Sequence, residues 1–290
     1  MNSIEISAVT KQYKGKVKGL DHVSFSIGTG VFGLLGHNGA GKTTLMRLIA
    51  TILRPTEGTI TVLGNDTMKA SDAVRQNIGY LPQELAMYNN LSALDFVLYM
   101  ARLKGIKDDS AALQMLEEVG MAEYKNRKIG QLSGGMKRRV GIAQALVGNP
   151  RIVIVDEPTA GLDPEERVRF RSILSRYAKT DRTIILSTHI VEDIYQLCEQ
   201  VAVLRGGKLF FSGSTDTLLN QVKGKIKVLD IGSEQELAGL QNQVVVLSVA
   251  YTGDGIKARI MDEADRFRQA PAQETLEDAY VYCMGGKNHA

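Results

Sequence analysis

Residues 36–44, Gly-His-Asn-Gly-Ala-Gly-Lys-Thr-Thr, constrain this chain more than any other segment. They match the phosphate-loop pattern Gly-x-x-x-x-Gly-Lys-Ser/Thr at every required position. Glycines allow backbone conformations that a β-carbon forbids, so the N–H groups can surround a phosphate at the start of a helix. Lys42 can reach the β- and γ-phosphates, and the Thr43 hydroxyl can ligate Mg²⁺. The segment predicts a nucleotide site lined by Gly36, Asn38, Gly39, Ala40, Gly41, Lys42, Thr43 and Thr44.

The flanking residues supply the strand and the helix that this loop requires. Residues 31–35 form a short apolar run, typical of a buried strand that leads into the loop, and residues 44–49 have the pattern of a helix that leaves it. This context favours a phosphate loop over an ordinary glycine-rich turn. The loop alone does not separate a kinase, a GTPase, a helicase or a transport ATPase.

Composition and charge limit the classes of protein that could contain such a site. The chain has 290 residues, enough for one large domain and a smaller one, and its net charge of +3 is too small to indicate a nucleic-acid partner. We expect no membrane span, because no run of 18 apolar residues occurs, and no signal peptide at the N-terminus. Cys198 and Cys283 fit no metal-ligand spacing, so we expect two reduced thiols in an intracellular protein.

Apolar runs and turn signals predict the fold class. Residues 3–27 alternate and contain turns, which is typical of short antiparallel strands, and another strand is expected at 59–62. The pattern is helical from about 84 to 139. Continuous apolar runs, typical of central parallel strands, occur at 151–155, 183–187 and 201–204. We therefore expect an α/β fold with a mostly parallel sheet, helices on both of its faces and an antiparallel β subdomain.

Two adjacent carboxylates follow the apolar run at 151–155. Asp156 is placed to hold Mg²⁺, directly or through water, and Glu157 to polarise a water that attacks the γ-phosphate. Adjacent carboxylates repel each other unless a cation is near, so an ordinary polar strand end is the weaker alternative. Because ligands of parallel sheets bind at the carboxyl ends of strands, we expect the phosphate loop, this acid pair and His189 at one edge.

A second candidate anion site lies at residues 132–136, Leu-Ser-Gly-Gly-Met, just before a predicted helix. Ser133 and the N–H groups of Gly134 and Gly135 can bind a phosphate at the start of that helix. A serine at this place is also a usual helix N-cap, so the pattern by itself leaves both interpretations open.

The order of these motifs closely resembles the ABC ATPase family. The phosphate loop is followed by Gln83 in Tyr-Leu-Pro-Gln, the signature at 132–136, Asp156-Glu157, Ala-Gly-Leu-Asp at 160–163 and His189. This order and spacing match the family's Walker A, Q-loop, signature, Walker B, D-loop and H-loop over about residues 3–215. The signature departs at its last place, with Met136 where glutamine is commonest, but that position lies past the phosphate-binding groups.

The resemblance implies roles for further residues. Tyr13 falls where the family has an aromatic that stacks on adenine; a strand-edge tyrosine is the alternative. Gln83 is implied to sense the γ-phosphate and Mg²⁺. His189 is implied to contact the γ-phosphate and orient the water, although a histidine taken alone is more often structural. Asp163 is implied to lie at a subunit interface, where it couples two sites.

The resemblance also implies the activity, which is ATP hydrolysis coupled to transport across a membrane. ATP and Mg²⁺ are the implied ligands. The residues implied to act in hydrolysis are Lys42, Gln83, Glu157 and His189. The residues implied to hold Mg²⁺ are Thr43, Gln83 and Asp156.

The sequence pattern changes after about residue 222. Short strands are predicted at 225–231, 244–250 and 255–261, and Thr275 opens a helix with the spacing of a capping box. We expect a nucleotide-binding domain over residues 1–221, with a helical subdomain at about 84–140. The remaining residues, 222–290, are expected to form a small accessory α+β domain without a recognisable catalytic constellation.

The chain has one phosphate loop and one signature, and the family places each ATP between the loop of one copy and the signature of another. The expected helix 136–147 is about 18 Å long, and its far end is tied to the phosphate loop through the strand at 151–155. The signature should therefore project away from the chain's own nucleotide. A two-fold homodimer satisfies both sites, and a heterodimer with a related ATPase satisfies the same geometry.

The resemblance implies separate membrane permease subunits, which would hold this chain at the cytoplasmic face of the membrane. Residues 271–280 look like the ending of ATPase subunits of prokaryotic multidrug, antibiotic or polysaccharide exporters. We therefore expect an exporter subunit that works by ATP-driven dimerisation. An importer subunit is one alternative, and a non-transport ABC protein acting on ribosomes or DNA is another. In the family the segment 84–104 docks the membrane subunit; ordinary packing is the alternative for any single residue.

Overall fold

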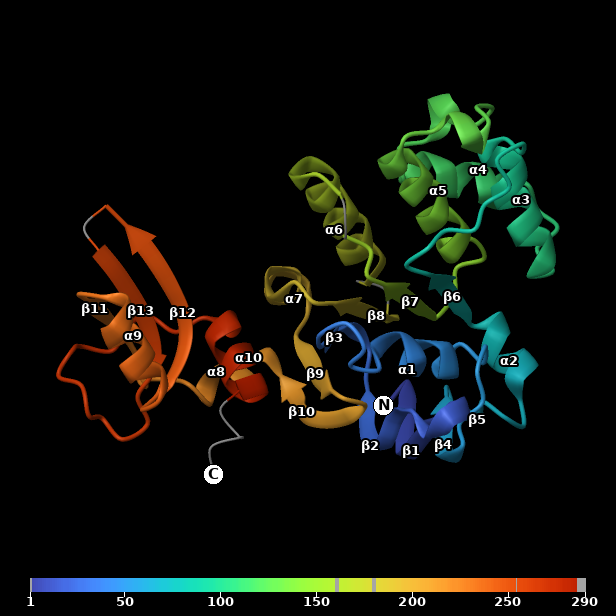
Figure 1. The fold of residues 1–290 in the computed structure, drawn as a ribbon. Helices are drawn as coiled ribbons and strands as arrows, with labels where there is room; N and C mark the ends of the chain where they lie inside the picture. The colour runs from blue at the N-terminus through green and yellow to red at the C-terminus, as the bar shows by residue number, and fades with distance from the viewer. Residues whose placement is uncertain (1, 160–161, 179–180, 254, 286–290) are drawn as a thin grey trace. The chain divides into compact units, whose positions relative to one another are not determined.

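The computed structural model describes residues 2–159, 162–178, 181–253 and 255–285 (Figure 1). The chain forms two compact units, Met1–His189 with Leu204–Leu209, and Ile190–Val203 with Phe210–Ala290. The second unit begins earlier along the chain than the accessory domain expected at 222–290. No helix in the described ranges is long and apolar enough to cross a membrane.

An antiparallel sheet begins the first unit. β1 (Ile4–Gln12) pairs with β2 (Lys18–Ile27) on one side and with β4 (Glu57–Val62) on the other, and β5 (Asn65–Asp66) completes the order β2-β1-β4-β5. Both Ile4 and Ile60 are fully buried, as the inward positions of alternating strands should be. The predicted antiparallel strands are confirmed.

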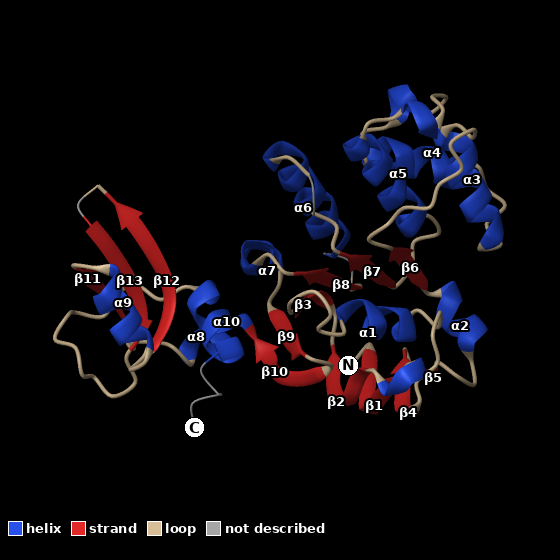
Figure 2. Ribbon diagram, in the orientation of Figure 1, coloured by secondary structure: helices blue, strands red, loops and turns tan. Residues whose placement is uncertain are grey.

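A parallel sheet forms the centre of the first unit (Figure 2). It contains β3 (Gly30–Leu35), β8 (Thr183–Thr188), β7 (Ile152–Asp156) and β6 (Ile78–Leu81), in that order. Every residue of β7 and β8 is buried, as expected for parallel strands with both faces covered. Leu204–Leu209, which come from the end of β9 (Gln200–Arg205) and the start of β10 (Lys208–Ser214), also belong to this unit.

The register of these strands aligns their carboxyl ends. Leu35 of β3 lies opposite Thr188 of β8, and Ser187 of β8 lies opposite Asp156 of β7. The phosphate loop and His189 follow the ends of β3 and β8 directly, and the acid pair spans the end of β7, so the topology brings them to one edge of the sheet. This edge is the one that the sequence predicts.

Helices precede or follow several strands of the sheet. α1 (Lys42–Ile49) leaves the phosphate loop, α2 (Ser71–Gln76) precedes β6, and α6 (Pro164–Ala178) connects β7 to β8. The position of α1 is as predicted. Helix α2 is short and buries only Val74, so it gives no periodic apolar signal in the sequence.

The helical part of the first unit contains α3 (Ala93–Leu103), α4 (Ser110–Glu118) and α5 (Gly134–Leu146), which pack against one another in the green part of Figure 1. Residues 84–92 are not helical, in contrast to the pattern expected from residue 84. Helix α3 begins after Ser92 because the Ser92 hydroxyl accepts a hydrogen bond from the Asp95 N–H at 3.0 Å. Single 3-10 turns occur at Lys14–Lys16, Ala122–Tyr124 and Ile129–Gln131.

The second unit contains a three-stranded antiparallel sheet, in the order β11 (Ile226–Ile231), β13 (Gly255–Met261) and β12 (Val245–Thr252). The three strands predicted after residue 222 are confirmed. The helices of this unit are α7 (Val191–Leu197), α8 (Thr215–Asn220), α9 (Glu234–Gln241) and α10 (Leu276–Gly285).

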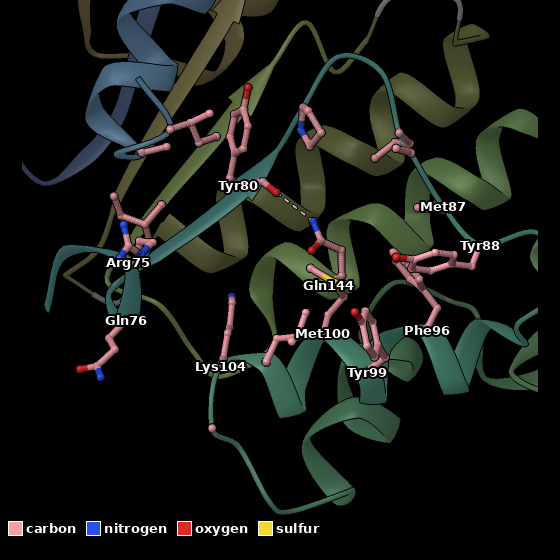
Figure 3. A pocket seen from close by; sticks show the side chains of 18 of the residues that line it. Arg75, Gln76, Tyr80, Met87, Tyr88, Phe96, Tyr99, Met100, Lys104 and Gln144 are labelled. Atoms are coloured by element: carbon pink, nitrogen blue, oxygen red, sulfur yellow. Dashed lines mark hydrogen bonds between the residues drawn. The ribbon is translucent and has the colours of Figure 1, made fainter. Parts of the chain in front are cut away.

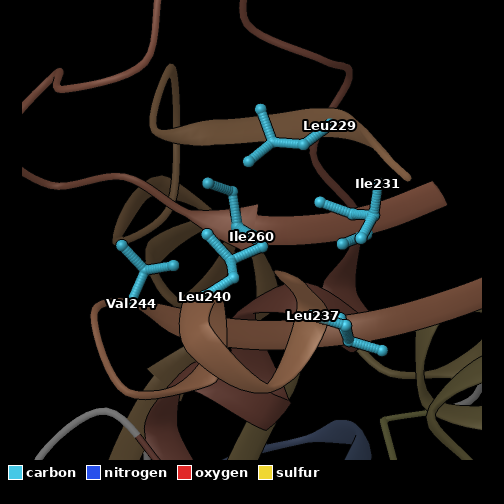
Figure 4. Close-up of a cluster of buried hydrophobic side chains, with 7 residues drawn as sticks. Leu229, Ile231, Leu237, Leu240, Val244 and Ile260 are labelled. Atoms are coloured by element: carbon cyan, nitrogen blue, oxygen red, sulfur yellow. The ribbon is translucent and has the colours of Figure 1, made fainter. Parts of the chain in front are cut away.

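Helix α9 packs on one face of this sheet and closes a small hydrophobic core (Figure 4). Leu237 and Leu240 of α9 meet Leu229 and Ile231 of β11 and Ile260 of β13. Each of these side chains is removed from water, which stabilises the fold by about 25 cal/mol for every Å² of apolar surface buried.

A partly buried ion pair fixes the start of α10. The Asp278 carboxylate accepts hydrogen bonds from Arg259 Nε of β13 at 2.7 Å and from the N–H and hydroxyl of Thr275 at 2.7 and 2.8 Å. The Asp278 N–H donates to the Thr275 hydroxyl in return, at 3.2 Å, so the predicted capping box is present, with aspartate as its acid. Burial opposes ionisation of Asp278, but the bonds from Arg259 and Thr275 outweigh it and hold the pKa of that carboxyl below its usual value.

We predict that Asp278→Ala lowers the free energy of unfolding by about 3–5 kcal/mol, because it leaves the partly buried Arg259 without its anion. Denaturant unfolding at pH 7 measures the change. The control is Asp230→Ala, which removes an exposed pair with Lys257 and should cost less than about 1 kcal/mol. Because the pKa of Asp278 is lowered on folding, its stabilisation is complete above the unfolded pKa of about 3.9 and is lost as the pH falls through the folded value. Equal losses in the two variants would contradict this account.

Candidate functional site

The phosphate loop lines a cavity of about 250 Å³ at the carboxyl edge of the parallel sheet. Gly41 is the N-cap of α1, with φ of 106°, and a β-carbon there would lie 2.5 Å from the Gly19 carbonyl oxygen. Gly39 has φ of 81°, also in the left-handed region. The backbone of this loop therefore requires glycine at both positions, as the motif predicts. Gln83 and Glu157 line the same cavity.

Lys42 is the buried cation of this cavity. Its side chain is 5% exposed, and Nζ donates a hydrogen bond to the Gly36 carbonyl oxygen at 2.6 Å. The same Nζ lies 3.0 Å from Oε1 of Glu157, whose side chain is 6% exposed. Each of these charges is compensated by the other, which a buried ion requires.

Glu157 also contacts His189. Its Oε2 lies 2.7 Å from Nδ1 of His189, a side chain that remains about half exposed. The backbone of Glu157 has φ of 47°, an uncommon value for a residue with a β-carbon, and its N–H donates to the Ser187 hydroxyl at 2.9 Å. The structure therefore brings Lys42, Glu157 and His189 together around one carboxylate.

Asp156 offers an oxygen for a cation. Oδ1 accepts hydrogen bonds from the Ser187 hydroxyl at 2.6 Å and the Thr43 hydroxyl at 3.3 Å. Oδ2 is buried and has no hydrogen-bond partner among the described residues. A buried carboxylate oxygen of this kind, next to a hydroxyl at the mouth of a phosphate loop, fits the oxygen ligands that Mg²⁺ prefers.

The signature residues do not share this cavity in the described part of the chain. Ser133 is exposed and caps α5, since its hydroxyl accepts a hydrogen bond from the Met136 N–H at 3.3 Å. Gly134 has no atom within 4 Å of the place where a β-carbon would be. The start of α5 is thus open to a ligand that the chain's own phosphate loop does not hold.

Asp163 caps α6. Its carboxylate accepts a hydrogen bond from the Glu166 N–H at 2.8 Å. The neighbouring residues 160 and 161 of the expected D-loop lie outside the described residues.

Comparisons with known proteins decide the family. A family model described as "ABC transporter" matches residues 20–160. NatA of Bacillus subtilis, an ABC transporter ATP-binding protein, is 37% identical over 223 residues, which cover 74% of this chain and 91% of NatA. This chain belongs to the ABC transporter ATP-binding proteins.

Two further relatives carry names that describe their transport. The bacitracin transport ATP-binding protein BcrA of Bacillus licheniformis is 30% identical and covers 98% of this chain and 97% of its own. The Nod factor export ATP-binding protein I of Rhizobium etli is 36% identical, over 83% of this chain and 77% of its own.

Solved ABC cassettes have the same fold. A dimeric ATP-binding cassette in a post-hydrolysis state, bound to ADP and Pi, has a TM-score of 0.67 and 27% identity, covering 73% of this chain and 98% of its own. This confirms the predicted ABC ATPase fold. The chain is accordingly an ATP-binding and ATP-hydrolysing cassette, of the class that works with membrane permease subunits.

Tyr13, the aromatic residue expected to stack on adenine, lies beside the phosphate loop. The Tyr13 hydroxyl and the Thr44 hydroxyl are 3.1 Å apart, and a β-carbon at Gly19 would lie 2.7 Å from Cε2 of Tyr13. Tyr13 is 40% exposed, so its ring keeps a surface for a ligand. Its stacking on adenine stays a prediction.

A larger cavity, of about 890 Å³, lies beside the Q-loop (Figure 3). Residues 84–88 and α3 line it, which places the expected docking segment on its wall. Figure 3 shows Tyr88, Phe96 and Tyr99 on one side, away from Arg75 and Gln76.

Burial lowers the pKa of Lys104, which lines this cavity, to about 8. Neither Lys104 nor Arg75 belongs to a sequence motif, so the sequence alone does not indicate that they line this cavity. Both side chains line the cavity because the fold brings α2 and the end of α3 to its wall.

Proposed function

We propose that this chain powers export of a substrate through separate membrane subunits at the cytoplasmic face of the membrane, by ATP-driven dimerisation. The observation that carries the ATPase mechanism is the Glu157 carboxylate, held between Lys42 and His189 at the phosphate-loop cavity. Export is supported by similarity to the bacitracin transport and Nod factor export subunits.

In the proposed reaction the γ-phosphate lies between Lys42 and the acid pair. Lys42 exchanges its contact with Glu157 for the β- and γ-phosphates, where its charge is compensated by the nucleotide. Glu157, released from the ion pair, accepts a proton from the attacking water. His189 orients that water and contacts the γ-phosphate, and the N–H groups of residues 36–44 stabilise the phosphate charge.

Thr43 and Asp156 would hold Mg²⁺, with Gln83 approaching from the Q-loop. When bound, the ion neutralises charge on the phosphate oxygens. Asp156 is suited to this role because its buried Oδ2 is free of protein donors among the described residues, while Oδ1 is fixed by Ser187.

A second chain would complete each ATP site. Ser133, Gly134 and Gly135 lie at the exposed start of α5, outside the chain's own phosphate-loop cavity. In a two-fold dimer the signature of one chain would bind the γ-phosphate held by the other, with Asp163 at the interface. A second copy of this chain, or a related ATPase, can supply that surface.

The cavity beside the Q-loop is the surface we propose for the membrane subunit. It is large enough for part of a helix, and its exposed aromatic and apolar residues, Tyr88, Tyr99 and Leu103, suit an amphipathic partner. Because the same loop contains Gln83, docking there would connect the membrane subunit to the nucleotide.

We predict that Glu157→Gln lowers ATP turnover by about 10²–10⁴-fold, because the amide keeps the shape of the side chain but cannot accept the proton. Steady-state hydrolysis and binding of a fluorescent ATP analogue measure the two effects separately. Binding should persist, and an ATP-bound dimer should accumulate in size-exclusion chromatography. Glu165→Gln, at an exposed carboxylate of α6, is the matched control and should keep its turnover. Substantial turnover in Glu157→Gln would assign the base to another group.

A mixing experiment tests the composite site. Lys42→Ala and Ser133→Arg should each be inactive alone, and mixing them should restore ATPase activity, because one site then pairs an intact Lys42 with an intact Ser133. The restored rate should be at most about half of the wild-type rate per dimer, since only one site is complete. Full activity of Ser133→Arg by itself would show that the signature makes no required contact.

A third prediction concerns the proposed docking surface. Tyr88→Glu should weaken copurification with the membrane subunit by about tenfold or more, because it replaces an aromatic anchor, of the kind worth about 2 kcal/mol, with a charge. Its ATPase activity in the isolated chain should stay within about twofold of wild type, while transport in reconstituted vesicles falls. Tyr124→Glu, at a similarly exposed tyrosine outside the cavity, is the control. Unchanged assembly and transport in Tyr88→Glu would place the docking surface elsewhere.

A further inference from the structure

Arg138 binds two loops of the active site at once. It lies on α5, five residues after Ser133, and among the described residues its guanidinium donates five hydrogen bonds, all to backbone carbonyl oxygens. On the Q-loop side, Nη1 contacts Gln83 at 2.9 Å and Pro82 at 3.4 Å. On the β7 side, Nη2 contacts Glu157 at 2.8 Å and Asp156 at 3.3 Å, and Nε contacts Pro158 at 3.1 Å.

Partial burial of the Arg138 guanidinium removes hydration from a charged group, which costs free energy. Loss of hydration lowers the pKa of its guanidinium, although the nearby charge of Asp156 opposes the shift. A guanidinium stays protonated in proteins, so the cation has to be satisfied by its surroundings. Carbonyl oxygens from two separate loops provide that compensation, and their positions are thereby fixed relative to each other.

The loop that contains Glu157 needs such support. Glu157 has φ of 47°, and a left-handed backbone at a residue with a β-carbon persists only where its surroundings hold it. The Ser187 hydroxyl accepts the Glu157 N–H at 2.9 Å, and Arg138 donates to the Glu157 carbonyl oxygen. The peptide groups on both sides of this α-carbon are therefore anchored.

The neighbouring arginine serves as a comparison. Arg139 donates to the Gly120 carbonyl oxygen at 3.2 Å, and its Nε lies 3.5 Å from Glu166. It therefore contacts the helical part and α6 rather than the Q-loop and the end of β7. Adjacent residues of one helix differ in this way because they point about 100° apart.

We propose that Arg138 is a positioning residue for hydrolysis: it holds the backbones of Glu157 and Gln83 at fixed positions relative to α5. It acts through the backbone and does not touch the nucleotide. Because Ser133 and Arg138 belong to the same helix, a ligand that moves the start of α5 would shift the Glu157 and Gln83 carbonyl groups together. The inference rests on the proposed roles of Glu157 and of the composite site.

The test compares Arg138→Lys and Arg138→Gln with Arg139→Lys. A lysine keeps the charge and the long stem of Arg138, but a single ammonium cannot span two loops as a planar fork does. We expect the kcat of Arg138→Lys to fall about 10–100-fold, since a displacement of about 1 Å in a catalytic group has effects of this size. KM and the affinity for a fluorescent ATP analogue should stay within about threefold, and Arg139→Lys should keep the wild-type kcat.

A double variant shows whether Arg138 acts through Glu157. In the Glu157→Gln background the carboxylate is already absent, so adding Arg138→Lys should lower single-turnover hydrolysis by a smaller factor than it does in the wild-type background. Wild-type kcat in a folded Arg138→Lys would overturn the proposal. So would equal and additive losses of kcat, ATP affinity and thermal stability, because those indicate a purely structural role.

The outcomes also separate this proposal from the proposed function. If Glu157→Gln keeps its turnover, the assignment of the base fails, whatever Arg138 does. If Glu157→Gln loses turnover while Arg138→Lys keeps it, only the inference on Arg138 fails. If Arg138→Gln is too unstable to purify, the kcat of Arg138→Lys decides the question, because the lysine retains the charge and most of the packing.

Discussion

The ion pair between Lys42 and Glu157 is the interaction on which the active site depends. Both side chains are almost fully buried, and their charged atoms are 3.0 Å apart. Removing one partner of such a pair leaves an uncompensated charge, which costs about 3–5 kcal/mol, so the pair joins the phosphate loop firmly to the end of β7. Nucleotide phosphates offer Lys42 an alternative anion. We infer that ATP binding and release of the Glu157 carboxylate from Lys42 are one event in this chain.

The fold makes this pair possible by aligning three parallel strands. β3, β8 and β7 end at matched positions, and each is followed directly by a loop that contains residues of the candidate site. The glycines of the phosphate loop and the left-handed backbone at Glu157 then turn the chain toward a common point. Strands buried on both faces are rigid, which explains how loops with unusual backbone angles can keep a fixed geometry.

The sequence predicts the features of the fold that depend on local patterns. The phosphate loop, the antiparallel strands, the central apolar runs and the three strands after residue 222 each have a periodic or motif signal. The sequence does not predict helix α2 and strand β6, since a helix with one buried residue and a strand of four residues give little signal. Residues 84–92 differ from the helical expectation because the cap at Ser92 sets the start of α3.

The residues of the candidate site also differ in whether the sequence predicts them. Lys42, Thr43, Asp156, Glu157 and His189 follow apolar strands, so the topology of a parallel sheet predicts their meeting. Arg138 was not predicted, because Lys137, Arg138 and Arg139 are alike in sequence and only the rotation of α5 turns one of them toward two loops. Contacts between residues more than fifty positions apart, such as Arg138 with Gln83, have no local signal.

A structure of the unaltered chain with Mg²⁺ and a non-hydrolysable ATP analogue tests the central claim most directly, because it retains the Glu157 carboxylate. The account predicts that the Lys42 ammonium lies on the β- and γ-phosphates, about 2.7–2.9 Å from their oxygens, and has left residue 157. It also predicts that Ser133 of a second chain contacts the same γ-phosphate. A structure in which Lys42 stays paired with residue 157 while ATP is bound within a single chain would contradict both the exchange of the ion pair and the composite site.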